Sequence, residues 1–241
     1  MQVVIPFHSA DAQDALDLIS WMGQLGTEPT HNAILAVDAG LEWGYAVDVL
    51  TAANRVFRYV SIISNEIPVS GWPQGANSLF WKTAEYCKTI DQPFLCLEPD
   101  CVPLTKDWLT RIHDAYKGGY LGHIYECNQP GLPHQLLSGV AVYAASAFDL
   151  ITPRIGTQPH LAWDVSAAEV ILPQASDSHL FHHFWGEKDL APTFREARTP
   201  HCPVNVRTLD HIRKGAVLFH RNKDGTLRRL IGHKLGIAPA T

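Results

Sequence analysis

The sequence predicts an α/β fold in which helices flank a mostly parallel sheet. Short apolar segments alternate with amphipathic segments over the first half of the chain, as they do in βαβ units. The 241 residues are 46% hydrophobic and 18% charged, which is enough apolar material for a sizeable core. We find no repeat, linker or low-complexity segment, so we expect one domain over residues 1–241.

Each element of the first half has a local signal. The expected strands are apolar runs that stop at polar or turn residues, and they lie at residues 2–7, 33–40 (stopping at Asp38), 57–63 and 94–98. The expected helices place apolar residues on one face, and they begin at Ser9 or Asp11, near residues 43–55 and 76–88, and after a Thr105 cap.

The pattern changes after Tyr120, which divides the chain into residues 1–119 and 120–241. Residues 122–146 suggest two strands joined by a loop rich in glycine and proline, followed by a helix from about Ser146. Residues 163–172 look helical after Asp164. A late strand is expected at residues 216–219, before a turn at Asp224 and Gly225.

Polar residues follow three of the expected strands. His8, Asp38 and the pair Glu98 and Asp100 each come directly after an apolar run. Because ligands bind beyond the carboxyl ends of the strands in such sheets, these side chains are expected on one rim. Alone, two carboxylates beside Pro99 could simply shape a loop. Hard divalent cations prefer oxygen ligands, however, so the pair is also a candidate metal site.

Three later positions carry a functional and a structural interpretation each. His220 is followed by cations, including Lys223, that suit a phosphate-facing loop, although a lone histidine is more often structural. Asp164 is either a helix N-cap or a general base. Ser138 and Gly139 either let the backbone approach a ligand or mark a β-bulge.

Several protein classes are disfavoured. The chain lacks a GxSxG elbow, a Walker loop and a GxGxxG fingerprint. His179, His182 and His183 suggest zinc, but a helix would place only two of them on one face, and no further ligand follows at a recognisable spacing. Five cysteines without framework spacing, no signal segment and no bilayer-length apolar run predict a cytoplasmic protein without membrane contact.

Charge is unevenly distributed along the chain. Residues 1–194 carry 9 Lys and Arg against 21 Asp and Glu, a balance of −12. Residues 195–241 carry 10 against 3, a balance of +7. The basic end is either a solvated surface or the side that meets a polyanion.

The motifs occur in an order typical of one enzyme family. Glu98-Pro99-Asp100, Ser138-Gly139, Trp163-Asp164 and His220 follow one another along nearly the whole chain. In this order the chain resembles nucleotide-sugar glycosyltransferases of the GT-A fold. The resemblance implies a Rossmann-like sheet, with residues 1–119 binding the nucleotide sugar and residues 120–241 the acceptor.

More narrowly, five segments are similar to small bacteriophage-type glycosyltransferases. They read GWPQGAN (71–77), LEPDCVPLTKDWL (97–109), SGVAVY (138–143), AWDVS (162–166) and FHRNKDGTL (219–227). Several members of that group glycosylate hypermodified bases in DNA. The resemblance therefore implies a 5-hydroxymethylpyrimidine such as 5-hydroxymethylcytosine as the acceptor, and the cytoplasm of a host cell as the location.

The resemblance also implies roles for individual residues. Asp100 and His220 would hold Mn²⁺ or Mg²⁺, whereas Glu98 replaces the first Asp of the DxD motif and is expected to act through water or to shape the turn. Asp164 would be the catalytic base. Contacts to a UDP-sugar are expected from Pro6, Phe7, His8, Asp38, Gly75, Asn77, Glu98, Ser138, Gly139 and Lys223.

The implied reaction is transfer of a hexose, by default glucose, with inversion at the anomeric carbon. Asp164 would remove the acceptor proton on the side opposite the leaving diphosphate. Aromatic residues could stack on a base or sugar, although each is more often core; they are Trp72, Trp81, Tyr143 and Trp163. The alternatives are a saccharide or protein hydroxyl as the acceptor, and a sugar-nucleotide-binding protein without turnover.

Overall fold

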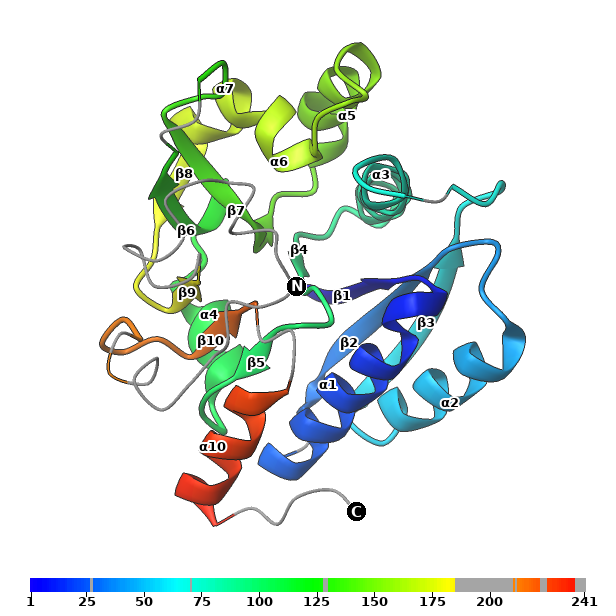
Figure 1. Cartoon of the computed structure of the whole chain (residues 1–241), viewed down its shortest axis with the longest axis vertical. Helices are drawn as coiled ribbons and strands as arrows, with labels where there is room; N and C mark the ends of the chain where they lie inside the picture. Colours follow the sequence, from blue (N-terminus) through cyan, green and yellow to red (C-terminus); the bar gives the residue numbers. More distant parts are fainter. Residues whose placement is uncertain are drawn as a thin grey trace.

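A computed structural model of the chain describes residues 1–26, 28–69, 71–127, 130–184, 210, 212–221 and 225–236. The described segments form a large central sheet with helices on both faces and a small second sheet at one end (Figure 1). The predicted α/β class is confirmed.

The central sheet has seven strands in the order β3-β2-β1-β4-β7-β6-β8. Its first part is parallel, and consists of β1 (Gln2–Phe7), β2 (Glu28–Val37), β3 (Phe57–Ser64) and β4 (Phe94–Cys96). Its second part contains antiparallel pairs, and consists of β6 (Tyr120–Glu126), β7 (Gln135–Tyr143) and β8 (Ala175–Asp177). Strands from both halves of the sequence thus share one sheet.

Helices connect the parallel strands. The helices of the first half are η1 (Ser9–Asp11), α1 (Ala12–Leu25), α2 (Trp43–Ala53), α3 (Gln74–Thr89) and α4 (Trp108–Ala115). Those of the second half are α5 (Ala147–Thr157), α6 (Trp163–Ser166), α7 (Ala168–Ile171), η2 (Leu172–Gln174) and α10 (Thr226–Leu235). Figure 1 shows α1 and α2 on one side of the parallel strands and α3 on the other.

The two faces of β1 bury different partners because successive side chains of a strand alternate. Val3, Ile5 and Phe7 are buried in the core that contains α1 and α4. Val4 is buried in the core that contains α3 and α5. The chain therefore forms a three-layer structure, and the β1–β4 pair lies at its centre.

A second sheet has three strands in the order β5-β10-β9. They are β5 (Val102–Pro103), β9 (Phe181–His183) and β10 (Leu218–His220). Helix α10 covers this sheet with Leu227 and Ile231, which share a core cluster with Trp21 of α1. The Trp21 Nε1–H donates a hydrogen bond to the Pro103 carbonyl at 2.8 Å and so joins α1 to β5.

Some predicted boundaries are wrong. Thr105 does not cap α4: Asp107 occupies the N-cap position, and the Thr105 hydroxyl is buried without a hydrogen-bond partner among the described residues. Strand β4 ends at Cys96 rather than at residue 98, because a turn begins there. Helix α10 was not among the predicted elements; its buried residues pack against α1 and the second sheet.

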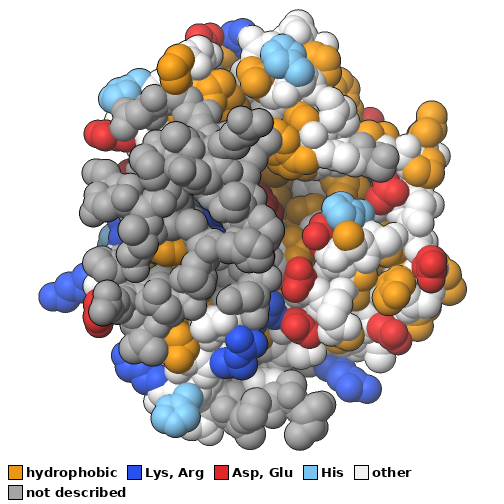
Figure 2. Space-filling view, viewed as in Figure 1, with side chains coloured by type: hydrophobic (Ala, Val, Ile, Leu, Met, Phe, Trp, Pro, Cys, Tyr) orange, Lys and Arg blue, Asp and Glu red, His pale blue; other side chains and the backbone are white. Residues whose placement is uncertain are grey.

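The face viewed in Figure 1 is hollowed near its middle, where hydrophobic side chains line the depression (Figure 2). Acidic side chains stand out over α1 and α2 on the same face. Within the described residues, no helix has both the length and the apolar character that a membrane span requires.

Candidate active site

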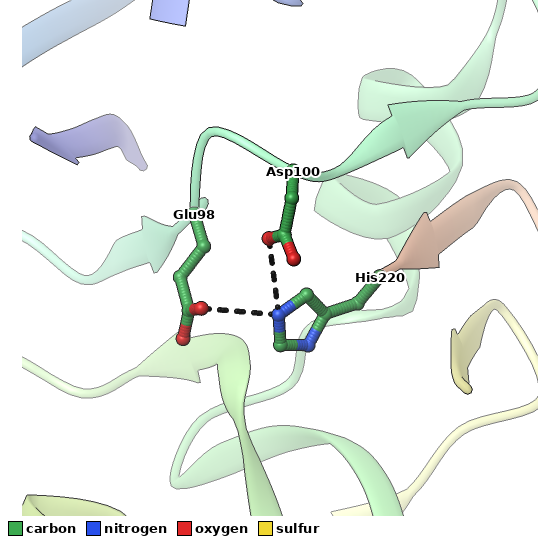
Figure 3. Close-up of side chains that lie close together, drawn as sticks. All are labelled: Glu98, Asp100 and His220. Carbon is green, nitrogen blue, oxygen red and sulfur yellow. Dashed lines mark hydrogen bonds and ion pairs between the residues drawn. The ribbon is translucent and has the colours of Figure 1, made fainter. Parts of the chain in front are cut away.

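The two carboxylates lie in a tight turn that follows β4. The Cys101 N–H donates a hydrogen bond to the Glu98 carbonyl at 3.0 Å, which closes a four-residue turn. Pro99 occupies the second position of this turn, where its fixed φ is favoured. Proline between two acids therefore has a local cause: it sets the turn that brings both side chains to His220 (Figure 3).

His220, the last residue of β10, contacts both carboxylates. Its Nε2 lies 3.1 Å from Glu98 Oε2 and 3.3 Å from Asp100 Oδ1. One ligand atom from each of the three residues lies within 4.8 Å of the others. The side chains of Asp100 and His220 are 4% and 7% exposed, whereas that of Glu98 is 29% exposed, so the group reaches solvent at Glu98.

The electrostatics of this group favour a bound cation. Burial alone lowers the pKa of His220, but the negative charges of Glu98 and Asp100 and their hydrogen bonds outweigh it and raise the pKa to about 9. The Nε2 proton thus lies between two carboxylates, where a metal ion would take its place. Two carboxylates and one imidazole form a donor set suited to a divalent cation. The residues fit the predicted metal site.

Behind His220 lies a second layer of polar side chains. His220 Nδ1 is 2.7 Å from His183 Nδ1, and Ser138 Oγ is 3.0 Å from the same His183 atom. Burial, followed by the positive charge of His220, lowers the pKa of His183 well below its usual value, so His183 is neutral. Ser138 is buried and contacts this layer; its predicted contact with the donor stays a prediction.

Gly139 lies in a β-bulge and also beside the site. Ile124 pairs with Leu137 and Gly122 with Ala141, so residues 138–140 of β7 stand opposite one residue of β6. Such bulges re-aim side chains and are common near active sites. A Cβ on Gly139 would lie 3.0 Å from Trp163 Cζ2 and 3.2 Å from Glu98 Oε1. The bulge interpretation of Gly139 is therefore confirmed, whereas approach of its backbone to a ligand stays a prediction.

Gly139→Ala is expected to lower the free energy of unfolding by about 1–3 kcal/mol, because the new methyl group overpacks Trp163 and displaces Glu98. Differential scanning calorimetry measures the loss. Gly156→Ala is the matched control: Gly156 lies in α5 with open space around it, and alanine there is expected to stabilise the helix. Equal stability of Gly139→Ala and wild type would contradict the close packing at Gly139.

Asp164 is the second residue of α6. Ala162 occupies the N-cap position, so the interpretation of Asp164 as the N-cap is wrong, although its Oδ1 accepts a hydrogen bond from the Val165 N–H at 3.0 Å. Burial, followed by the negative charge of Glu98, raises the pKa of Asp164 to about 7. A carboxylate with this pKa can accept a proton near neutral pH, as a general base does.

The ends of β1 and β2 form another part of the rim. His8 is exposed and its Nε2 lies 3.0 Å from Asp11 Oδ2, whereas Phe7 is 1% exposed and faces the core. Pro6 is half-buried. Asp38 accepts hydrogen bonds from the Gly40 and Val69 N–H groups at 2.9 and 3.0 Å, so it ties together the loops that follow β2 and β3.

The start of α3 lies against the segment that carries Asp164. Gly75 is buried, and its N–H donates to the Gly71 carbonyl at 2.8 Å. The Asn77 Nδ2 donates to the Leu161 carbonyl at 2.8 Å. Asn77 Oδ1 is buried and accepts no hydrogen bond from the described residues, which leaves an acceptor for a water molecule or a ligand.

Two cations follow His220. Lys223, the predicted phosphate contact, lies outside the described residues. Arg221 has a φ of +87°, a left-handed conformation that a side chain other than glycine rarely adopts. Backbone strain of this kind is concentrated at functional sites. Sequence reasoning treated Arg221 only as a neighbour of His220, because strain leaves no trace in residue type.

Of the four aromatic residues that could stack on a base or a sugar, two are buried and two are exposed. Tyr143 and Trp163 are buried; the Trp163 Nε1–H donates to the Tyr143 hydroxyl at 3.2 Å, and the Trp163 ring stacks on Phe80. They are core residues that support Gly139 and Asp164. Trp72 and Trp81 are 54% and 38% exposed.

The histidine cluster does not form a candidate metal group among the described residues. His182 and His183 lie on strand β9, not on a helix, and therefore point to opposite faces. His182 Nδ1 accepts a hydrogen bond from the Arg213 N–H at 3.3 Å. In the described part of the chain, Glu98, Asp100 and His220 form a candidate metal group, and the three clustered histidines do not.

Comparison with known proteins identifies the fold. No protein-family model matches the chain, and no curated protein matches its sequence. Solved structures do match. A structure of the galactosyltransferase LgtC with donor and acceptor sugar analogues has a TM-score of 0.58 at 11% identity, over 100% of this chain and 97% of that chain.

Two further glycosyltransferase structures are similar to this chain in fold. The bifunctional glycosyltransferase WbbM has a TM-score of 0.59 at 10% identity, over 91% of this chain and 45% of that chain. The apo-form glycosyltransferase GlyE of Streptococcus pneumoniae TIGR4 has a TM-score of 0.57 at 12% identity, over 96% of this chain and 59% of that chain. The chain spans about half the length of WbbM and nearly all of LgtC. The predicted GT-A fold is thereby confirmed.

Proposed function

We propose that this protein is a metal-dependent glycosyltransferase that moves a hexose from a nucleotide sugar to a hydroxyl group. The observation that carries this proposal is the cluster of Glu98, Asp100 and His220 beyond the carboxyl end of β4, in a fold shared with glycosyltransferases. In such folds the ligand site lies at this edge of the sheet.

Asp100 and His220, with Glu98 beside them, would hold Mn²⁺ or Mg²⁺. The ion would neutralise negative charge on the diphosphate of the donor. Arg221 and Lys223 would add positive charge on the side of the leaving group, as cations do for oxyanions. His8, Asp38 and the backbone of Pro6 and Phe7 would surround the base and ribose, and Gly75 and Asn77 would lie beside the nucleotide.

Asp164 would accept the proton of the acceptor hydroxyl. The acceptor oxygen forms a bond to the anomeric carbon as the bond from that carbon to the diphosphate oxygen breaks, and the proton stays on the Asp164 carboxylate. A base opposite the leaving group implies a single displacement with inversion. NMR of the product decides this point, because a retained anomeric configuration would contradict it.

For the acceptor we propose a 5-hydroxymethylpyrimidine in DNA, on the similarity of five segments to phage-type glycosyltransferases. The acidic start of α1 makes a saccharide the second candidate: Asp11 is the N-cap of this helix, Asp14 and Asp17 follow within it, and their negative charges repel a phosphate backbone. Arg229 and Lys234 on α10 are exposed, whereas Arg228 is buried 3.9 Å from Asp17. If DNA is the acceptor, Arg229→Glu with Lys234→Glu weakens its salt-dependent binding.

The first assay measures release of UDP from UDP-glucose and other UDP-hexoses with Mn²⁺, in the absence and presence of acceptors. Duplex DNA containing 5-hydroxymethylcytosine and simple saccharides are the two acceptor sets. Donor hydrolysis alone would establish catalysis and exclude a protein that only binds the sugar nucleotide. No turnover and no binding of any nucleotide sugar would overturn the proposed function.

A further inference from the structure

The second layer behind the metal group is built around one nitrogen atom. His183 Nδ1 lies 2.7 Å from His220 Nδ1 and 3.0 Å from Ser138 Oγ. The first distance is that of a short hydrogen bond between two ring nitrogens. Two nitrogens at this separation share a single proton, so one donates and the other accepts.

The direction of this hydrogen bond follows from the chemistry of His220. A neutral imidazole carries one proton, on either Nδ1 or Nε2. His220 Nε2 is the atom that faces Glu98 and Asp100, so it must present a lone pair to bind a metal. The His220 proton must then lie on Nδ1, and the acceptor within reach is His183 Nδ1. A neutral imidazole nitrogen has one lone pair, so the Ser138 hydroxyl at 3.0 Å can only share that acceptor with the shorter contact from His220 at 2.7 Å.

We propose that His183 is a positioning residue for the metal site, and that its Nδ1 accepts the His220 Nδ1–H and thereby leaves His220 Nε2 free to ligate the cation. This inference rests on the metal site of the proposed function. Groups that hydrogen-bond to a metal-ligating histidine fix its tautomer and ring orientation, and their loss typically costs about 10–100-fold in metal affinity.

His183 itself is held firmly enough for this task. Its ring stacks on Tyr125 with the centroids 5.1 Å apart and the planes 8° from parallel. Its backbone N–H donates to His123 Nδ1 at 2.9 Å. Strand β9 pairs with β10 so that His183 lies directly beside His220. The acceptor atom is therefore fixed by stacking, by backbone hydrogen bonding and by strand register.

The inference is tested by titrating purified protein with Mn²⁺ alone and measuring free Mn²⁺ by electron paramagnetic resonance. His183→Phe keeps the ring that stacks on Tyr125 but removes the acceptor, and we expect its Kd for Mn²⁺ to rise about 10–100-fold. In His183→Asn, Oδ1 takes the place of Nδ1 as an acceptor, and we expect its Kd to stay within about threefold of wild type. His182→Phe, one residue away on the opposite face of β9, is the matched control and should bind as wild type does.

The outcomes separate this inference from the proposed function. If wild type binds Mn²⁺ and His183→Phe binds it equally well with an unchanged circular dichroism spectrum, the positioning role is overturned while the metal site stands. Equal losses in His183→Phe and His183→Asn would also overturn it, because restoring the acceptor would not restore binding. Failure of wild type to bind Mn²⁺ would overturn the metal site, and this inference with it.

A measurement on wild type avoids any folding defect in the variants. Long-range ¹H–¹⁵N spectra of the Mg²⁺-loaded protein report which nitrogen of each histidine carries the proton. We expect His220 to be protonated on Nδ1 and His183 on Nε2. The reverse pair of tautomers would contradict the inference.

Discussion

Asp100→Asn is expected to abolish the stabilisation that Mn²⁺ and UDP together give to this protein. Asp100 supplies a buried carboxylate 3.3 Å from His220 Nε2, and an amide in its place carries no charge to hold a cation. A ligand at a hundred times its Kd stabilises the native state by about 2.7 kcal/mol. For a chain of this size that corresponds to a rise in Tm of about 5–10 °C. Differential scanning fluorimetry measures it.

The matched control is Asp114→Asn, which removes an exposed carboxylate from α4. It should show the full rise in Tm with Mn²⁺ and UDP. Comparing the variants without ligand separates loss of folding from loss of binding. A full ligand-dependent rise in Asp100→Asn would show that the turn after β4 does not hold the metal, and the three-residue group would then be a structural ion pair.

Much of the fold could be predicted because its signals are local. Strand β1 is an uninterrupted apolar run, and its polar successor, His8, marks where it ends. The apolar second half of β2, residues 33–37, likewise ends at Asp38, although the strand begins five residues earlier than predicted, in a polar stretch. In parallel sheets this is enough to place the ends of several strands on one rim, so the candidate carboxylates were predicted before their geometry was known.

The small second sheet could not be predicted in the same way. Of its three strands, only β10 was predicted, as a strand at residues 216–219; β5 and β9 have two and three residues, which is too short for an alternating pattern to be recognised. They come from residues 102–103, 181–183 and 218–220, which are far apart in the sequence. The contact between His183 and His220 depends on this pairing, and so the role of His183 emerges only in three dimensions.

Helix α10 was also not predicted, because its stability depends on contacts with residues such as Trp21 that are far away in the sequence. Its four apolar residues stand among two arginines, a histidine and a lysine, so its sequence was interpreted as part of a basic, solvated end of the chain. Leu227 and Ile231 are nevertheless buried with Trp21 and Phe219, so tertiary packing stabilises the helix. Arg228 is buried as well, so the basic end of the chain exposes fewer cations than its composition suggests.

Asp164→Asn is expected to lower kcat by about 10²–10⁴-fold with little change in donor binding, because an amide cannot accept the proton of the acceptor hydroxyl. Steady-state kinetics with saturating donor measure this loss, and fluorimetry with Mn²⁺ and UDP checks that the donor site is intact. Asp177→Asn, at an exposed ion pair with Arg213, is the control carboxylate. Full turnover in Asp164→Asn would remove Asp164 from the mechanism.

Asp164→Asn is expected to lower kcat but to raise the stability of the folded protein. The sign of this second effect follows from the raised pKa of Asp164. The folded-state pKa of Asp164 is raised from 3.8 to about 7, so between these values the folded protein retains a proton that the unfolded chain releases. Stability from this group therefore falls as the pH rises from about 4 to about 7, and is constant above that range. Asp164→Asn removes the penalty, so in metal-free protein its Tm relative to wild type should rise over this window.

A bound cation is expected to lower the pKa of Asp164 and so to move the pH range over which Asp164 titrates to lower values. The negative charge of Glu98 is one cause of the raised pKa of Asp164, and a metal ion beside Glu98 offsets this charge. The acid limb of kcat with Mn²⁺ is therefore expected below the pH at which metal-free Asp164 titrates in the unfolding experiment. If the two midpoints coincide, the cation does not lie near Glu98. A lower midpoint with Mn²⁺ links the metal site and the base electrostatically, and places both carboxylates in one active site.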